Sequence, residues 1–184
     1  MTALRIQDAR LATLLDHYLE ARGERPMPSR RDIDALAIAP LLPHVWICEY
    51  RAAEGTFRYR LAGEEINQVF RGRVAGRLLS ELVLGEHFDK TNASFLGIVE
   101  RRQATLTSGP IYRCLERVAL GERLALPLSE DGETADGIIG ATIRRTLVDA
   151  RTAAACEQRC QTVEVATLGR AVETPARRQA AVRF

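Results

Sequence analysis

Between residues 4 and 21, apolar residues recur every three or four positions, with arginine and aspartate between them. This spacing places them on one side of a helix, where an apolar stripe must be buried against something. The stripe consists of Leu11, Leu14, Leu15, Tyr18 and Leu19. Gly23 and two nearby prolines end the helix, and Ser29 can cap a second, shorter helix over residues 30–36. The pattern predicts an amphipathic N-terminal helix followed by a turn.

Alternating apolar and polar residues then predict a β-hairpin. Residues 44–51 (HVWICEYR) are rich in β-branched and aromatic residues, and residues 57–63 (FRYRLAG) alternate as a half-buried strand does. A turn around Gly55 joins them. Glycines interrupt residues 64–82 and allow only short helical turns, whereas residues 86–102 predict a longer amphipathic helix. The apolar side of that helix should cover a sheet.

The second half of the chain predicts three consecutive antiparallel strands, over residues 104–113, 115–128 and 137–145. The strand–helix–strand alternation of a parallel sheet is missing from this order. The sequence therefore predicts an α+β fold: a five-stranded antiparallel sheet with helices on one face, preceded by the N-terminal helix.

Three segments follow from this pattern: an N-terminal helix and turn (1–30), a domain (31–147) and a flexible tail (148–184). Within the tail, residues 153–160 could continue a helix and residues 161–168 could form a short strand.

Composition narrows the classes of function. A chain of 184 residues, 46% apolar and 27% charged, fits one globular domain. Its longest apolar run, residues 37–48, is shorter than the ~20 residues that span a bilayer, so we expect no membrane span. A net charge of +2 argues against nucleic acid as a partner. The N-terminal residues lack the pattern of a secretion signal, so we expect a cytoplasmic protein.

Residues 57–82 carry a more specific pattern. A strand leads to a polar turn, a helical segment with Asn67, then Gly72 and the run GRLLSEL from Gly76 to Leu82. This order resembles the core of the PAS family. Residues 27–49 and 124–141 resemble short bacterial proteins that consist of a single PAS domain, and the resemblance covers residues 11–143. It implies a non-enzymatic sensory or adaptor protein that signals through contacts with a homodimer partner or another protein.

The interior of such a fold could enclose a mostly apolar cavity for a small ligand of unknown identity. The residues that we expect to face it are Val69, Phe70, Leu82, Phe88, Phe95, Val99, Leu126 and Ile139. The alternative is that these side chains pack together as a solid core.

The N-terminal stripe offers a second candidate site. Resemblance to other PAS proteins implies that such a helix forms a dimer or binds a partner. The alternative is that it folds back onto its own sheet.

The chain offers little material for catalysis or metal binding, since its imidazoles are only His17, His44 and His87. His87 opens the predicted helix over residues 86–102, where haem-binding PAS domains often place an axial ligand. A polar residue in the first turn of a helix is the simpler interpretation. Photoreactive flavin chemistry of the PAS type needs a cysteine within residues 64–82, and that segment has none. We therefore predict no metal site and no evident cofactor.

Two further pairs of residues could take part in metal binding or catalysis. Cys156 and Cys160 stand four apart and could form half of a metal site, but no second pair accompanies them. Glu49 and Arg113 are the only titratable candidates for an enzyme that uses the cavity. We predict no catalytic residue. The alternatives are a small-molecule-binding enzyme with the same cavity and a structural interaction domain with a filled core.

Overall fold

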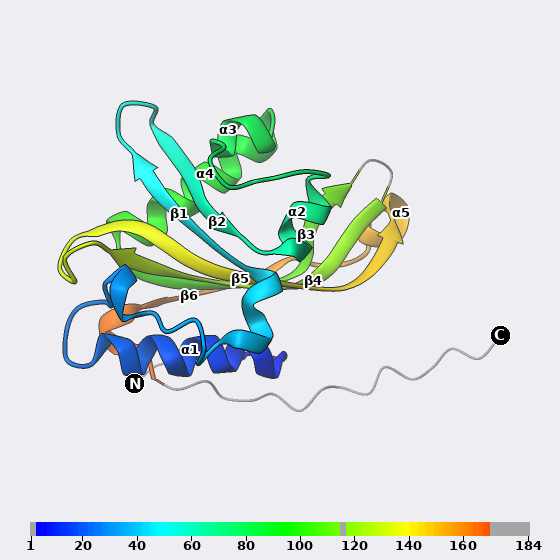
Figure 1. Ribbon diagram of the computed structural model, residues 1–184. Coiled ribbons are helices and arrows are strands. Elements are labelled where there is room, and N and C mark those ends of the chain that lie inside the picture. The colour runs from blue at the N-terminus through cyan, green and yellow to red at the C-terminus, as the bar shows by residue number, and fades with distance from the viewer. Residues whose placement is uncertain (1–2, 115–116, 170–184) are drawn as a thin grey trace.

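An antiparallel sheet of six strands, in the order β2-β1-β5-β4-β3-β6, forms the centre of the computed structural model (Figure 1). The structure describes residues 3–114 and 117–169. The strands are β1 (Val45–Arg51), β2 (Thr56–Ala62), β3 (Gln103–Cys114), β4 (Arg117–Ser129), β5 (Ala135–Asp149) and β6 (Arg159–Glu164). The α-helices are α1 (Ala9–Arg22), α2 (Glu64–Val69), α3 (Leu79–Leu82), α4 (Glu86–Glu100) and α5 (Ala150–Ala154). Short 3₁₀ helices are η1 (Arg30–Asp32), η2 (Ala39–His44) and η3 (Val165–Thr167). The predicted α+β fold with a PAS-like antiparallel sheet is confirmed.

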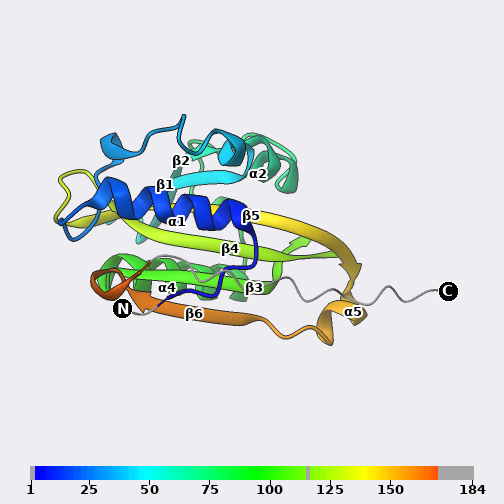
Figure 2. The same ribbon diagram turned by 90° about the horizontal axis from the view of Figure 1, so that it is seen from below.

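Helices cover both faces of the sheet. Helices α2, α3 and α4 lie over one face, and α1 lies across the other (Figures 1 and 2). We call these the α4 face and the α1 face. The sheet residues of the α4 face include Trp46, Cys48, Phe57, Tyr59, Ala125 and Ile138. Those of the α1 face include Val45, Leu106, Leu124, Leu126, Ile139, Ala141 and Ile143. The central strands are therefore buried on both sides.

The apolar stripe of α1 is used within the chain. Leu11, Leu14, Leu15 and Tyr18 are fully buried in the core of the α1 face, and Leu19 is partly buried against it. The Tyr18 hydroxyl donates a hydrogen bond of 2.7 Å to the carbonyl of Pro127 in β4. The helix therefore folds back onto its own sheet, which is the alternative to forming a dimer through this stripe. The stripe is consequently covered by the chain's own sheet rather than offered to a second molecule.

A buried carboxylate holds the start of α1 on the sheet. Glu122 of β4 accepts hydrogen bonds from the backbone N–H groups of Gln7, at 3.2 Å, and Asp8, at 3.0 Å. Asp8 is also the N-cap of α1, and its side chain accepts from the backbone N–H of Arg10. Burial raises the pKa of Glu122, although these N–H groups and Arg145 favour its charged form.

The expected flexible tail contains regular structure. β6 pairs antiparallel with β3, from Gln103 opposite Glu164 to Ser108 opposite Arg159. It thereby adds a sixth strand to the five that were predicted, and α5 connects it to β5. The helix and the short strand that the sequence allowed in this segment are present as α5 and β6, and the outer edge of β3 supplies the partner of β6. The flexibility of residues 148–184 stays a prediction. Residues 170–184 lie outside the described part of the chain.

The structure also defines the β3–β4 hairpin. Its register runs from Thr105 opposite Ala125 to Cys114 opposite Arg117, with an irregularity between Pro110 and Tyr112. This irregularity turns the aromatic side chain of Tyr112 toward α2, where it reaches Phe70. Among the described helices, none is both long and apolar enough to cross a membrane.

Candidate ligand site

Aromatic side chains fill the centre of the α4 face. The rings of Trp46 and Phe95 are stacked at 5.2 Å and 9°, and Phe57 meets Phe95 edge-on at 5.4 Å. Tyr59 packs against Trp46 at 6.0 Å. The period of two along β1 and β2 brings these sheet residues to one face, and the helical period of α4 brings Phe95 down onto them. A β-carbon on Gly140 would collide with the indole of Trp46, so this position of β5 must be small.

A polar cluster adjoins this aromatic core. The buried hydroxyl of Thr142 accepts hydrogen bonds from Trp46 Nε1, at 3.0 Å, and from Arg123 Nε, at 3.2 Å. Arg123 Nη2 donates to the carbonyl of Ile111 at 3.2 Å. The side chains come from β1, β4 and β5, so the cluster connects three strands of the sheet. A hydroxyl that accepts from two donors fixes the orientation of both.

Aromatic rings line the outer side of the cluster. The guanidinium carbon of Arg123 lies 4.7 Å from the centre of the Tyr112 ring, which is a cation–π contact. Phe70, at the end of α2, meets Tyr112 edge-on at 5.8 Å. Phe70, Tyr112 and Arg123 are half-buried, whereas Trp46 and Thr142 are buried. We call Trp46, Tyr59, Phe70, Tyr112, Arg123 and Thr142 the Arg123 cluster, and its half-buried corner is accessible to solvent.

Burial controls the protonation of the groups at this face. Burial raises the pKa of Tyr59 well above the ordinary value for tyrosine, and the neighbouring Cys48 and Tyr112 act in the same direction. Arg123 opposes this shift. Burial also raises the pKa of the Cys48 thiol. Both groups are therefore neutral at neutral pH.

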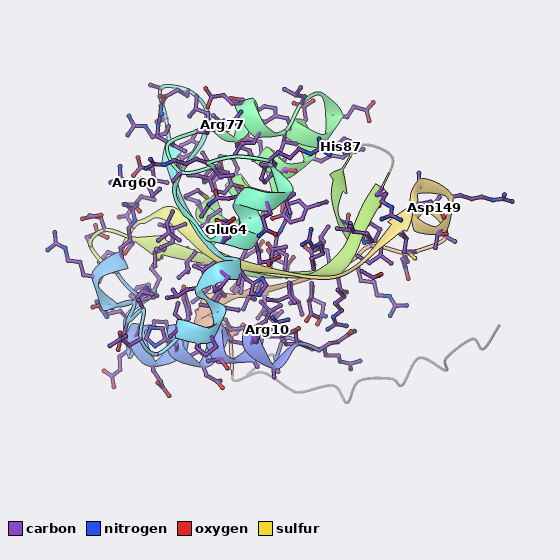
Figure 3. The ribbon with its side chains drawn as sticks, turned by 45° about the vertical axis from the view of Figure 1, so that its right-hand side comes forward. Arg10, Arg60, Glu64, Arg77, His87 and Asp149 are labelled. Atoms are coloured by element: carbon purple, nitrogen blue, oxygen red, sulfur yellow. The ribbon has the colours of Figure 1, made fainter. Side chains whose placement is uncertain are left out.

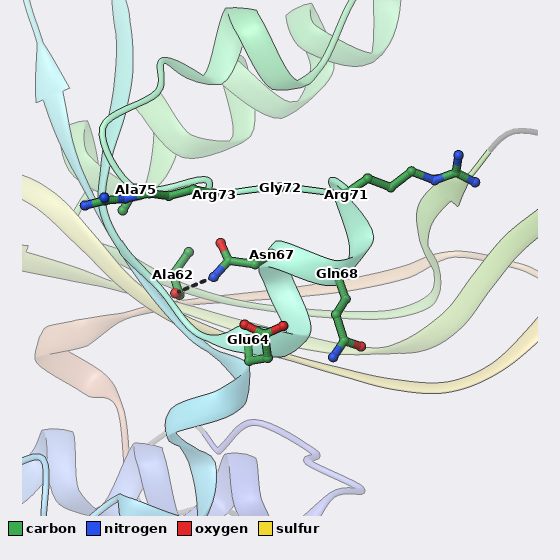
Figure 4. Close-up of a pocket in the computed structure, with 8 residues that line it drawn as sticks. All are labelled: Ala62, Glu64, Asn67, Gln68, Arg71, Gly72, Arg73 and Ala75. Carbon is green, nitrogen blue, oxygen red and sulfur yellow. Dashed lines mark hydrogen bonds between the residues drawn. The ribbon is translucent and has the colours of Figure 1, made fainter.

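A shallow, open depression lies beside α2 (Figure 4). Its volume is about 630 Å³, and it is lined by Ala62, Glu64, Asn67, Gln68, Arg71, Gly72, Arg73 and Ala75. Asn67, the residue of the PAS-like core motif, donates to the carbonyl of Ala62 at 3.4 Å and accepts from the backbone N–H of Val74 at 3.0 Å. This side chain therefore attaches the loop after α2 to the end of β2.

The structure brings together part of the predicted pocket. Phe95 is buried at the centre of the α4 face. Partly buried side chains around it are Phe70, Leu82, Phe88 and Val99. Val69 is half-buried at the end of α2.

The prediction is wrong for Leu126 and Ile139, which lie on the α1 face. Their neighbours Ala125 and Ile138 face α4 instead. Successive side chains of a strand point to opposite faces, so an error of one residue reverses the assignment. Because these central strands are apolar on both sides, alternation does not distinguish the two faces.

Sequence reasoning missed most of the Arg123 cluster. Trp46 is the only tryptophan of the chain, and it stands at an inward position of a predicted strand. Arg123, with Glu122 beside it, stands in the middle of a predicted strand whose following residues 124–128 are apolar. These two residues were the indications of a site in the sequence. A charged residue in a buried strand needs a specific environment, which is why Arg123 is informative. The contribution of Thr142 and Tyr112 depends on register and could not be derived from spacing.

The remaining candidates lie elsewhere. His87 is exposed in the first turn of α4 (Figure 3), so its imidazole is not enclosed as a haem ligand would be. Cys156 is half-buried and Cys160 is exposed. Within residues 3–114 and 117–169, no three His, Cys, Asp or Glu side chains gather as a metal site would require.

Of the two titratable candidates, the described part of the chain shows the side chain of Glu49 alone. Glu49 forms ion pairs with Arg30 at 3.5 Å, Arg51 at 3.4 Å and Arg60 at 3.6 Å. The side chain of Arg113 lies outside the described part of the structure.

Comparison with known proteins identifies one family. The profile of the PAS domain family matches residues 6–143. This range includes α1 as well as the sheet from β1 to most of β5. No curated protein sequence matches the chain.

Two solved structures resemble part of the fold. One is VqmA bound to DPO, with a TM-score of 0.47 and 12% identity over 60% of this chain and 56% of that chain. The other is the Vibrio cholerae VqmA dimer in the absence of target DNA, with the same TM-score and identity, over 60% of this chain and 51% of that chain. The aligned region therefore spans about half the length of those proteins.

Proposed function

The chain belongs to the PAS domain family, and we propose that it is a sensory signalling protein whose contacts with a partner protein change when a small ligand binds at the Arg123 cluster. One observation carries this proposal: hydrogen-bonding and charged groups converge within an otherwise apolar, aromatic face. Small-molecule sites typically combine an apolar lining with a few fixed polar groups. The half-buried corner formed by Phe70, Tyr112 and Arg123 gives a ligand access to them.

The chemistry of the site supports binding rather than catalysis. A general base must be ionisable near the working pH, and a nucleophile must have a lowered pKa or lie beside such a base. Burial instead raises the pKa of Tyr59 and of Cys48, which keeps both protonated. Arg123 is a cation under all ordinary conditions. Tyr59 and Cys48 are therefore not prepared for proton transfer, whereas the fixed polar groups of the cluster can orient and hold a ligand.

A second candidate function is a structural interaction domain with a filled core. The stacking of Trp46 on Phe95, with Phe57 edge-on to the same ring, favours it, because these rings occupy the centre of the α4 face. In that case signalling would use constant protein contacts and no ligand.

Native mass spectrometry of protein purified from its own host distinguishes the two functions. A ligand-binding protein should show a reproducible extra mass that is lost on denaturation. Tyr112→Ala should reduce the occupied fraction, because the ring contacts both Arg123 and Phe70. Arg71→Gln, at the open depression, is the matched control and should retain the extra mass. A protein that carries no extra mass in any preparation would support the filled-core alternative.

A further inference from the structure

Arg123 differs from the other half-buried arginines of the sheet in the kind of partner that it has. Arg58 pairs with Glu54 at 3.3 Å, and Arg144 pairs with Glu65 at 3.2 Å. Arg123 contacts a hydroxyl, a carbonyl and an aromatic ring, and none of its contacts within the described residues is a carboxylate. Removing a charge from water without a compensating charge is costly. The position is therefore electrostatically suited to an anion.

The guanidinium is also held in place before any ligand arrives. Nε is bonded to Thr142 and Nη2 to the carbonyl of Ile111, while Tyr112 covers one face of the group. Nη1 has no protein acceptor among the described residues, so its N–H groups are available. A fixed guanidinium binds a carboxylate with little further loss of side-chain entropy.

The surroundings of Arg123 define the rest of the ligand. Tyr112 and Phe70 are half-buried rings beside the guanidinium, and Tyr59 and Trp46 lie further in. Aromatic walls favour a flat, unsaturated body by stacking and edge-to-face contact. Among the contacts of the described residues, Arg123 is the only cation in the cluster. One positive charge balances a single carboxylate better than it balances a doubly charged phosphate.

Building on the proposed sensory function, we propose that the ligand is a small planar organic anion whose carboxylate is bound by Arg123 and whose ring lies against Tyr112 and Phe70. This assigns Arg123 as the residue that determines ligand class.

The sole tryptophan of the chain provides a direct readout, since Trp46 shares the Thr142 hydroxyl with Arg123. Benzoate and the isosteric neutral benzamide are the probes, titrated while Trp46 fluorescence and calorimetric heat are measured. Benzoate should bind with a dissociation constant on the order of 1 mM, as its size allows. Benzamide should bind at least about tenfold more weakly, because it lacks the charge-assisted hydrogen bonds.

Variants separate the charge from its geometry. Arg123→Gln should weaken benzoate binding at least about tenfold and remove the preference over benzamide. Arg123→Lys keeps the charge without the planar fork and should give an intermediate affinity. Arg159→Gln, an exposed arginine of β6, is the matched control and should bind as the wild type does. Near-ultraviolet circular dichroism of each variant checks that the fold is retained.

Different results would overturn the proposal of an anionic ligand and the proposal of a sensory function. Equal binding of benzoate and benzamide, or benzoate binding that survives Arg123→Gln in a folded variant, would overturn the assignment of an anion. The absence of benzoate binding at tens of millimolar would do the same. A neutral molecule found in the native mass spectrum would overturn the anion while leaving the sensory function intact. No bound molecule in any preparation would overturn the sensory function itself.

Discussion

Trp46 shows how one side chain depends on the residue opposite it in the sheet. Its indole is held by stacking on Phe95 and by a hydrogen bond to Thr142, and it lies directly over Gly140 of the neighbouring strand. The side chain is only 2% exposed, so it cannot avoid a clash by turning into solvent. Gly140 is therefore required by packing at this face and not by an unusual backbone angle.

Gly140→Ala should destabilise the protein by about 1–3 kcal/mol, because the new methyl group overpacks a rigid ring. The free energy of urea unfolding, followed by Trp46 fluorescence, measures this. Gly72→Ala is the matched control, since a β-carbon there meets no atom within 4 Å. Equal stability of the two variants would show that the indole can be displaced at little cost.

At the scale of elements, α1 belongs to the core of the protein. Leu14 is fully buried in the α1 face, whereas Thr13 beside it is exposed. Leu14→Ala should cost about 2–5 kcal/mol of unfolding free energy, and Thr13→Ala should cost less than about 0.5 kcal/mol. Chemical denaturation at two protein concentrations completes the test. A midpoint that rises with concentration would mean that a second copy of the chain contributes to the burial of this helix.

The attachment of α1 through Glu122 should depend on pH. Burial raises the folded-state pKa of Glu122 above its ordinary value of 4.5. The stability contributed by such a group is complete below the ordinary pKa and is lost as pH rises through the folded-state pKa. Glu122→Gln removes the charge and retains a hydrogen-bond acceptor.

Between about pH 4 and about pH 8, the wild type should therefore lose stability relative to Glu122→Gln. Urea unfolding of both proteins across this range gives the difference, in which the other titrating groups largely cancel. A difference that is constant with pH, or that changes in favour of the wild type, would contradict the buried-carboxylate assignment. Glu122→Ala should be less stable than Glu122→Gln at every pH, because it leaves the N–H groups of Gln7 and Asp8 without their acceptor.

Across the whole molecule, the strand order predicts where opening begins. β4 and β5 pair with strands on both sides, whereas β2 and β6 are the edges of the sheet. Amide hydrogens of β4, β5 and α1 should exchange most slowly, and those of β6 and α3 should exchange earlier. Hydrogen exchange with mass spectrometry resolves these segments. Early exchange of α1 would show that residues 1–30 form a separate unit, as the sequence suggested.

Local pattern in the sequence was sufficient for several features. The helical spacing from Leu11 to Leu19 predicts α1, the alternation after Gly55 predicts β2, and the GRLLSEL run indicates the PAS family. The fold class and the family are confirmed by the structure and by the family comparison. These features depend on side-chain periodicity and turn residues, which are properties of neighbouring positions in the chain.

Only the tertiary structure determined which face of the sheet each strand residue occupies, which strand pairs with β6, and which side chains form the Arg123 cluster. Leu126 and Ala125 are both apolar, and their faces differ because α1 covers one side of the sheet and α4 the other. Residues 159–164 become a strand because β3 offers an edge. The Arg123 cluster joins side chains that are distant in sequence, through a register that includes bulges. Such contacts follow from hydrogen bonding and burial between distant segments, so no local pattern specifies them.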